Sequence, residues 1–229
     1  MPTILVTGAS RGIGLGLVDR LAARGDRVLA CARDPATPAL AELTARHAGR
    51  VSAHRLDVGD DASVAALAAA LDGQPLDVLI NNAGLRGPRR QSALDMDFDG
   101  FAETLAVNTL APLRVAQALL PNLRAGERPR IVTVSSIMGQ LATAPPGDVA
   151  YRASKAAVNK VMQGLAAELR PSGIIVVVVH PGWVRTDMGG AGAALTVEQS
   201  TRGLVAMIDG LTMAQTGGFF DHDGKSLEW

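Results

Sequence analysis

The pattern of apolar residues along the chain constrains its fold more than any other feature. Short apolar runs alternate with longer alanine-rich stretches, and most of the runs are continuously hydrophobic. Continuous runs are typical of parallel strands covered by helices on both faces. We therefore expect seven strands, at 3–7, 27–32, 51–56, 76–80, 130–135, 174–180 and near 217–221.

The stretches between these runs have the length and composition of helices. Asp60 is a suitable N-cap for the third of them, and Pro171 with Gly173 ends the fifth. Helices are expected at 12–24, 38–48, 60–71, 98–123, 151–170 and around 197–211. No linker or low-complexity block divides the pattern, which predicts one α/β domain over 1–229. Its fold class is a doubly wound Rossmann fold with a central parallel sheet of about seven strands.

Composition narrows the class of protein further. Hydrophobic residues make up 48% of the 229 and charged residues 19%, so the chain can bury a sizeable core. Twenty-two Lys and Arg balance 22 Asp and Glu, which disfavours nucleic acid or an anionic membrane as the main partner. The single cysteine, Cys31, excludes a disulfide framework and fits a reducing cytoplasm. With no apolar run near the roughly 20 residues of a spanning helix and no signal peptide pattern, we expect a soluble, cytoplasmic protein.

The first strand is followed by a glycine-rich turn. Sheets of this kind bind ligands at the carboxyl ends of their strands, so chemistry is expected just after each strand. In TGASRGIG, glycines at positions 8, 12 and 14 let the backbone approach a pyrophosphate, whose charge the amides of the next helix would meet. Taken alone, this GxxxGxG spacing is also compatible with an ordinary tight turn.

The end of the second strand is where an adenosine ribose would bind. An acidic residue there accepts hydrogen bonds from the 2′-hydroxyl of NAD, whereas an arginine pairs with the 2′-phosphate of NADP. Ala32 and Arg33 favour the phosphate, and Arg11 can supply a second cation. Asp34 leaves NAD as an alternative cofactor. Arg33 is alternatively a solvated surface charge without a role in binding.

Polar residues follow the third and fourth strands as well. Asp57 and Val58 can contact an adenine ring, or Asp57 can cap a turn. The NNAG run at 81–84 can hold backbone close to a cofactor, or form a simple turn. Asn108 lies in an apolar helical stretch, and Pro112 removes the backbone donor for its carbonyl, so we expect a kink. Asn108 is then either part of a water relay or a satisfied core asparagine.

Ser135 and Ser136 end the fifth strand, and Tyr151 and Lys155 follow at the start of a helix. The spacing of Tyr151 and Lys155 places them on one helix face, about 6 Å apart along the axis. A lysine ammonium favours the phenolate and lowers the tyrosine pKa from its usual value near 10, which makes the hydroxyl a proton donor near neutral pH. Tyr151 is the only tyrosine in the chain. By itself, such a pair is also common on helix surfaces.

His180 ends the sixth strand and is interpreted as structural. The run 189–194 after PGWVRTDM is expected to be a mobile lid. An apolar pocket beneath it is expected to be lined by Met138, Leu141, Trp183 and Met188. No His, Asp and Glu cluster has the spacing of metal ligands, so no metal is expected.

In combination, TGASRGIG, NNAG, an internal Asn, SS, YxxxK and PG resemble the short-chain dehydrogenase/reductase superfamily over essentially the whole chain. The tail, with PGWVRTDMGG and GGFFDHDGKSLEW, is similar to its C-factor/sniffer-like carbonyl reductase branch. The resemblance implies a catalytic tetrad of Asn108, Ser136, Tyr151 and Lys155. It also implies cofactor contacts from Gly8, Ser10, Arg11, Gly12, Ile13, Gly14, Arg33, Asp57, Val58, Asn82, Ala83, Gly84, Tyr151, Lys155, Pro181, Gly182, Val184 and Thr186.

The serine position departs from the family pattern. Many members place it 13 residues before the tyrosine, which here is Met138, whereas Ser136 is 15 before. Loop insertions cost little, so the extra residues are expected at 145–148. We retain Ser136, because the alternative, Ser135, is expected to point to the opposite face of the strand.

The resemblance implies an NADPH-dependent oxidoreductase that reversibly reduces a ketone or aldehyde to an alcohol. Tyr151 would donate the proton, Ser136 would bond the substrate oxygen, Lys155 would hold the ribose and Asn108 would anchor a water. A nucleotide-binding signalling or regulatory protein of the C-factor type and an NADP-dependent epimerase or dehydratase stay open. The intact tetrad disfavours a pure binder, which has no need of Tyr151. The expected partners are a small carbonyl substrate and further copies of the chain, as a homodimer or homotetramer.

Overall fold

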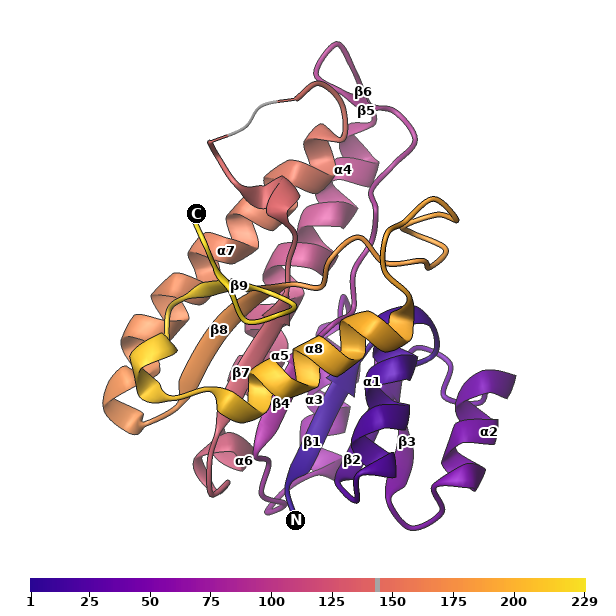
Figure 1. The fold of residues 1–229 in the computed structure, drawn as a ribbon, viewed down its shortest axis with the longest axis vertical. Helices are drawn as coiled ribbons and strands as arrows, with labels where there is room; N and C mark the ends of the chain where they lie inside the picture. The colour runs from indigo at the N-terminus through magenta and orange to yellow at the C-terminus, as the bar shows by residue number, and fades with distance from the viewer. Residues whose placement is uncertain (143–144) are drawn as a thin grey trace.

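The computed structural model describes residues 1–142 and 145–229, and its centre is one sheet of eight strands. The strand order is β10-β9-β8-β7-β4-β1-β2-β3 (Figure 1). The strands are β1 Thr3–Thr7, β2 Arg27–Ala32, β3 Val51–Arg55, β4 Val78–Asn81, β7 Arg130–Val134, β8 Ile175–His180, β9 Phe219–Asp221 and β10 Ser226–Leu227. The expected doubly wound α/β fold is confirmed, with its seven expected strands parallel. An eighth, β10, is antiparallel to β9 and was not expected.

Helices cover both faces of this sheet (Figure 1). One face packs against α1 Gly12–Ala23, α2 Pro38–Arg46 and α8 Val197–Gly210. The other packs against α3 Asp61–Ala70, α5 Ala111–Ala118 and α7 Val149–Leu169. The remaining elements are α4 Phe98–Leu105, α6 Leu120–Arg124, the short helices η2 Ile137–Gly139, η3 Arg170–Ser172 and η4 Met213–Gln215, and a hairpin of β5 Gln91–Ser92 and β6 Asp95–Met96.

The side chains of the strands alternate between two hydrophobic clusters. In β1, Ile4 and Val6 belong to the cluster under α1 and α8, whereas Leu5 belongs to the cluster under α5 and α7. The same alternation separates Val177 from Val176 in β8. Because both faces of the sheet are buried, most residues of the central strands are apolar, which explains the continuous hydrophobic runs.

The stretch expected to be one helix over 98–123 is divided. A π-helical turn, η1 Ala106–Leu110, lies between α4 and α5, and α6 follows as a separate short helix. Pro112 and Pro121 each lie in the first turn of a new segment, where a missing N–H costs least. The sequence predicted a kink beside Asn108, and the structure has a π turn at this position.

Two expected helix boundaries are confirmed. The Asp60 side chain accepts a hydrogen bond from the Ala62 N–H at the start of α3. α7 ends at Leu169, and the chain turns away at Gly173, which has a φ of 70°.

The sheet reverses its strand order beside β1. The chain moves outward from β1 through β2 to β3, and then returns to the other side of β1 to form β4. The carboxyl ends of β1 and β4 are thus neighbours. The chain leaves β1 toward α1 on one face of the sheet, and after β4 it reaches α5 on the other face. Ligands of doubly wound sheets bind at this switch point.

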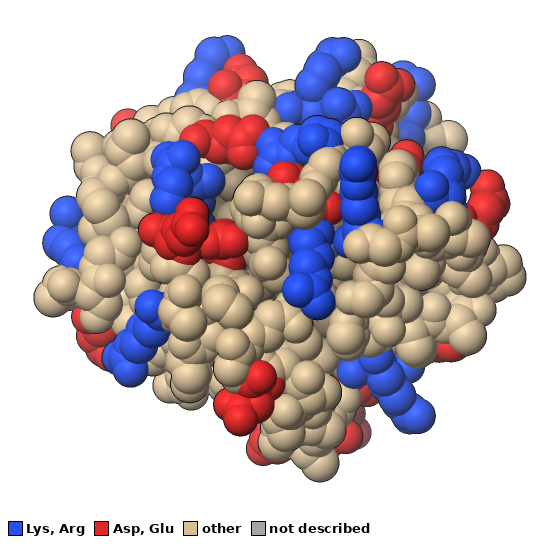
Figure 2. All heavy atoms as spheres, turned by 90° about the horizontal axis from the view of Figure 1, so that it is seen from below, with Lys and Arg blue, Asp and Glu red and all other residues tan. Residues whose placement is uncertain are grey.

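Charges of both signs are mixed on the end of the molecule that holds the N-terminus (Figure 2). This mixture agrees with the formal net charge of zero. No helix within the described residues is long and apolar enough to cross a membrane.

Candidate active site

The carboxyl ends of β1 and β4 are joined by a set of hydrogen bonds. The Thr7 hydroxyl accepts from the backbone N–H groups of Asn82 and Ala83, each at 3.0 Å. In return, the Asn82 side chain donates to the carbonyls of Thr7 at 2.9 Å and Gly8 at 3.2 Å. Asn82 therefore holds neighbouring backbone, as expected, and Thr7 is a positioning residue that the sequence analysis missed.

The glycine loop between β1 and α1 has no room for side chains at two of its positions. A Cβ on Gly8, where φ is 67°, would lie 2.9 Å from the Cα of Ala83. A Cβ on Gly14 would lie 2.2 Å from the Gly8 carbonyl oxygen. The first turn of α1 is consequently pressed against the end of β1, and Ser10, Gly12 and Ile13 remain half-buried at the surface above it. A helix N-terminus beneath a backbone turn of this kind fits a pyrophosphate.

The residues expected near an adenosine lie at the ends of β2 and β3. Arg33 is exposed, and one Asp34 carboxylate oxygen accepts from the Ala36 N–H at 2.9 Å, so Asp34 is engaged by its own turn. Asp57 likewise accepts from the Gly59 N–H at 3.0 Å and caps a turn, which was one of the two expectations for it. Val58 is buried and lines the same small cavity as Thr7 and Ala83.

Asn108 lies in the π turn, and its side-chain nitrogen and oxygen are both hydrogen-bonded. Its amide nitrogen donates to the Leu85 carbonyl at 2.8 Å and to the Ser154 hydroxyl at 3.0 Å, while its oxygen accepts from the Leu85 N–H at 2.8 Å. The carboxamide thus ties the segment after β4 to α7, as a satisfied core asparagine would. A Cβ on Gly84 would lie 3.2 Å from the Asn108 oxygen and 3.8 Å from the Lys155 ammonium nitrogen, so these three residues are close neighbours.

The two serines that follow β7 contact different residues of α7. Ser135 donates to the Asn159 side chain at 2.6 Å, inside the packing of α7. Ser136 caps the short helix η2 by accepting from the Met138 N–H at 3.1 Å, and its hydroxyl lies beside the Tyr151 phenol. The structure thus brings Ser136 to Tyr151 in spite of the two extra residues between them, and 145–148 forms a loop before α7.

Tyr151 and Lys155 are both buried on the first turns of α7, 9% and 5% exposed. The Lys155 nitrogen lies 5.6 Å from the centre of the Tyr151 ring and donates to the Val134 carbonyl at 3.0 Å. An ammonium carries three donors, and this hydrogen bond uses one of them. Lys155 therefore fits a ligand with hydroxyl groups, such as a ribose.

The pKa of Tyr151 is raised, contrary to the expectation that Lys155 lowers it. Burial, which disfavours the phenolate, is the largest cause, and the Ser136 hydroxyl and the Arg86 charge act against it. Burial also lowers the pKa of Lys155 to about 8, which weakens its positive charge near neutral pH. The spacing of Tyr151 and Lys155 predicts their pairing, whereas the desolvation of both groups arises only in the folded chain.

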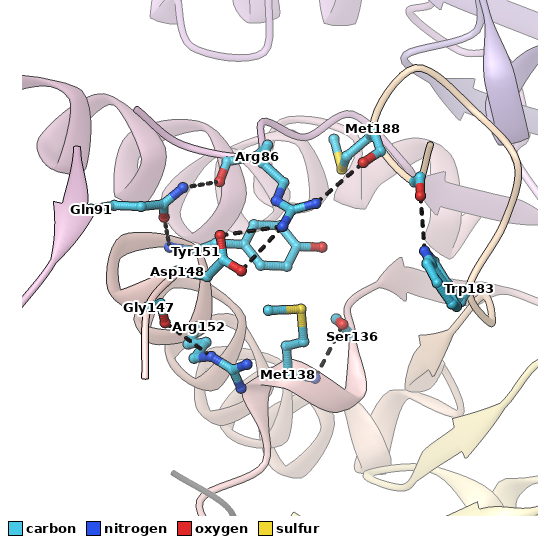
Figure 3. A network of polar contacts seen from close by, with 11 residues as sticks. Arg86, Gln91, Ser136, Met138, Gly147, Asp148, Tyr151, Arg152, Trp183 and Met188 are labelled. Carbon is cyan, nitrogen blue, oxygen red and sulfur yellow. Dashed lines mark hydrogen bonds and ion pairs between the residues drawn. The ribbon is translucent and has the colours of Figure 1, made fainter. Parts of the chain in front are cut away.

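Two charged residues beside Tyr151 were missed by the sequence analysis (Figure 3). Arg86 forms an ion pair with Asp148 at 3.1 Å and donates to the Met188 carbonyl at 3.3 Å. In addition, the Gln91 side chain accepts from the Tyr151 N–H at 3.1 Å. These contacts link segments up to 102 residues apart. The only local signal for them in the sequence is that Arg86, a charged residue, comes soon after the end of a strand.

The loop after β8 approaches the glycine loop. Pro181 is held by the Ser200 hydroxyl, which donates to its carbonyl at 2.6 Å, and Gly182 has a φ of 83°. Val184 is buried and forms a bridge with Leu195, while Thr186 lies against Gly12. Of the expected cofactor residues in this loop, Thr186 therefore lies against the turn after β1.

The expected lid, 189–194, is tied to its neighbours. The Trp183 indole donates to the Gly189 carbonyl at 2.9 Å, and Arg11 pairs with Asp187 at 3.1 Å. Met138, Trp183 and Met188 surround the open side of the Tyr151 hydroxyl (Figure 3). Leu141 is 83% exposed and is not enclosed with them.

His180 is buried at the end of β8, and burial lowers its pKa. Within the described residues, no three His, Cys, Asp or Glu side chains are placed to hold a metal ion.

Comparison with known proteins gives one family. Residues 2–194 match the short chain dehydrogenases. C-signal of Myxococcus xanthus is 47% identical over 157 residues, which cover 68% of this chain and 93% of C-signal.

Two solved structures superpose along the whole chain. The NADPH-bound carbonyl reductase from chicken fatty liver has a TM-score of 0.93 and 34% identity, covering 100% of this chain and 99% of its own. The carbonyl reductase Sniffer of D. melanogaster has a TM-score of 0.92 and 33% identity, covering 100% of both chains. With the glycine loop, the buried Tyr151 and Lys155 and the match over most of its length, this chain belongs to the short-chain dehydrogenase/reductase family of oxidoreductases.

Proposed function

We propose that this protein is an NADPH-dependent carbonyl reductase that converts a ketone or aldehyde reversibly into an alcohol. The observation that carries the proposal is the position of the Tyr151 hydroxyl. It is buried beside the Ser136 hydroxyl and near Lys155, at the carboxyl end of the sheet where the glycine loop opens.

The cofactor would lie across the switch point. The turn at Gly8–Gly14 and the N-terminus of α1 would hold the pyrophosphate, and Lys155 has donors for the nicotinamide ribose. When bound, NADPH supplies the hydride that reaches the carbonyl carbon.

The protein's own groups would handle the substrate oxygen and its proton. Ser136 donates a hydrogen bond to the oxygen, and Tyr151 transfers its phenolic proton to it as the negative charge develops. Because burial raises the pKa of Tyr151, the hydroxyl stays protonated at neutral pH, as a proton donor for reduction must. Asn108 fixes the segment that contains Gly84 against α7 and so keeps Lys155 and Tyr151 in place. Met138, Trp183 and Met188 would contact the apolar part of the substrate.

A preference for NADP over NAD is part of the proposal. Arg33 is exposed at the end of β2, where a 2′-phosphate would lie, and the Asp34 carboxylate is held by Ala36. Both features favour a dianion over a free hydroxyl. We further propose a cytoplasmic location and a homodimer or homotetramer, on the grounds of the single buried Cys31 and the resemblance to oligomeric family members.

Two other functions remain as competitors. The likeness to C-signal favours a signalling protein that binds a nucleotide without turnover. An NADP-dependent epimerase or dehydratase would use the same tyrosine. Against the first, a buried phenol without a reaction to serve has no purpose in a nucleotide binder.

The substitution Tyr151→Phe tests the mechanism. It keeps the ring and its packing and removes only the hydroxyl, so we expect turnover to fall by at least about 100-fold while NADPH binding stays nearly unchanged. Binding is measured by fluorescence of the bound cofactor and turnover by NADPH consumption. Near-normal turnover in this variant would show that another group donates the proton.

A further inference from the structure

Arg86 joins three segments around the open side of Tyr151. It follows β4, and its guanidinium contacts both Asp148 carboxylate oxygens, at 3.1 and 3.3 Å, and the Met188 carbonyl at 3.3 Å. Asp148 directly precedes α7, and Met188 lies at the edge of the lid. Figure 3 shows the Arg86 guanidinium next to the Tyr151 ring, linked to Asp148 on one side and to Met188 on the other.

The backbone near Asp148 and near Arg86 is held in a defined conformation. Asp148 has a φ of 51° and is the one non-glycine residue in the left-handed region within the described chain. Such a conformation is strained for a residue with a Cβ, and residues of this kind cluster at functional sites. Gln91 adds a second link, because its side chain donates to the Arg86 carbonyl at 3.2 Å and accepts from the Tyr151 N–H at 3.1 Å. The start of α7 and the segment with Arg86 are therefore fixed to each other.

We infer that Arg86 is a positioning residue for Tyr151, held beside the phenol by Asp148 and Met188 so that its positive charge eases release of the tyrosine proton to the substrate oxygen. This inference rests on the proposed function. It assigns to the Arg86–Asp148 pair a role in setting the pH range of the reaction, in addition to the tetrad.

The groups that face Tyr151 determine the sign of the effect. Ser136 approaches from η2, Lys155 from the next turn of α7, Arg86 from the segment after β4 and Asp148 from the loop before α7. Arg86 lowers the pKa of the phenol and Asp148 raises it, against the larger upward effect of burial. Since the Arg86 side chain is 51% exposed, solvent screens its charge and the effect is moderate.

The opposite signs of the two charges separate an electrostatic role from a structural one. If the pair only fastens two loops, removing either partner breaks the same ion pair and gives the same result. If the charges act on Tyr151, neutralising Arg86 raises its pKa and neutralising Asp148 lowers it. The variants Arg86→Gln and Asp148→Asn make this comparison with little change in size.

The first experiment is the pH profile of alcohol oxidation with NADP⁺, in which Tyr151 must act as a base. We expect the acidic limb of kcat/KM to move up by about half a pH unit in Arg86→Gln and down by a similar amount in Asp148→Asn. Arg86→Lys should restore the wild-type limb, because it keeps the charge. The inference would be overturned if the acidic limb of kcat/KM is unchanged in both variants, or if it moves in the same direction in both.

The second experiment needs no turnover. Tyr151 is the only tyrosine, so the near-ultraviolet absorbance of phenolate formation reports this one residue in the cofactor-free protein, with Tyr151→Phe as the blank. The same opposite shifts are expected, over the pH range in which circular dichroism shows a folded chain. Opposite shifts without any carbonyl turnover would refute the proposed function alone, and shifts of one sign would refute the role of Arg86.

Discussion

The proposed cofactor side and the proposed substrate side of this site are built in different ways. At the ends of β1 and β4, backbone meets backbone at distances that leave no space for a methyl group, and the hydrogen bonds around Thr7 and Asn82 are reciprocal. Around the lid, by contrast, Trp183 is 59% exposed and the ion pair of Arg11 with Asp187 lies in solvent. The backbone hydrogen bonds that hold the lid, such as those from Gly190 to Thr186 and from Leu195 to Trp183, are made within its own loop.

This difference teaches which half of the site tolerates change. A dinucleotide is the same ligand in every member of a family, so its binding site can be a rigid part of the core. Substrates differ, and an exposed rim can vary without cost to the fold. The following predictions test this division.

The largest effect is expected from a methyl group in the glycine loop. In Gly14→Ala, the new Cβ meets the Gly8 carbonyl at 2.2 Å, so we expect a loss of about 3 kcal/mol or more in the free energy of unfolding, together with NADPH binding. The matched change on the rim is Gly192→Ala, whose Cβ would have 4.0 Å to the Trp183 ring. Urea unfolding of both variants should show a change within about 0.5 kcal/mol for Gly192→Ala. Equal losses would erase the distinction between the two halves.

A smaller effect on the cofactor side is expected from Arg33→Ala. A charge-assisted hydrogen bond contributes roughly 1.5–3 kcal/mol, so the variant should lose a preference of about 10- to 150-fold for NADPH over NADH. The measurement is kcat/KM with each cofactor in wild type and variant. Arg46→Ala is the control, because Arg46 is an exposed arginine paired with Glu42 on α2 and is not among the expected cofactor contacts. An unchanged preference in Arg33→Ala would mean that another residue reads the phosphate.

Lys155 should destabilise the fold that contains it. Burial lowers its pKa from 10.5 to about 8, so the folded chain binds this proton less readily than the unfolded chain does. The resulting loss of folding stability is largest below pH 8, where Lys155 is charged in both states, and it disappears as the pH rises through 10.5, where Lys155 is neutral in both states. We expect Lys155→Met to raise the free energy of unfolding by about 1–3 kcal/mol at pH 7, with the gain shrinking toward pH 10, while turnover is lost. Denaturant unfolding at several pH values measures this, and a gain independent of pH would contradict the assigned cause.

The smallest effect is expected from the rim pair. Asp187→Asn removes an ion pair whose side chains are 72% and 80% exposed, so the free energy of unfolding should change by less than about 0.5 kcal/mol. Thermal unfolding at low and high salt checks this value. A larger, salt-sensitive loss would show that the lid is a structural part of the fold.

The sequence predicted those features whose cause is local. Continuous apolar runs located seven strands, and the serine pair after the fifth of them located the hydroxyl that lies beside Tyr151. Pro112 predicted the kink, although the π turn itself depends on how Asn108 packs against α7. The pairing of β10 with β9 was missed, because each strand is only two or three residues long and carries little periodicity. The raised pKa of Tyr151 was missed because burial is a property of the folded chain.

One measurement tests the central claim, which is that this chain transfers a hydride to a carbonyl. The purified protein is supplied with NADPH and a panel of simple aldehydes and ketones, and cofactor consumption is compared with the amount of alcohol formed. We predict that at least one compound is reduced with one NADPH consumed for each alcohol, and that Tyr151→Phe loses this reaction. Binding of NADPH without consumption, or conversion of a substrate without net consumption, would contradict the account in favour of a nucleotide-binding signalling protein or an epimerase.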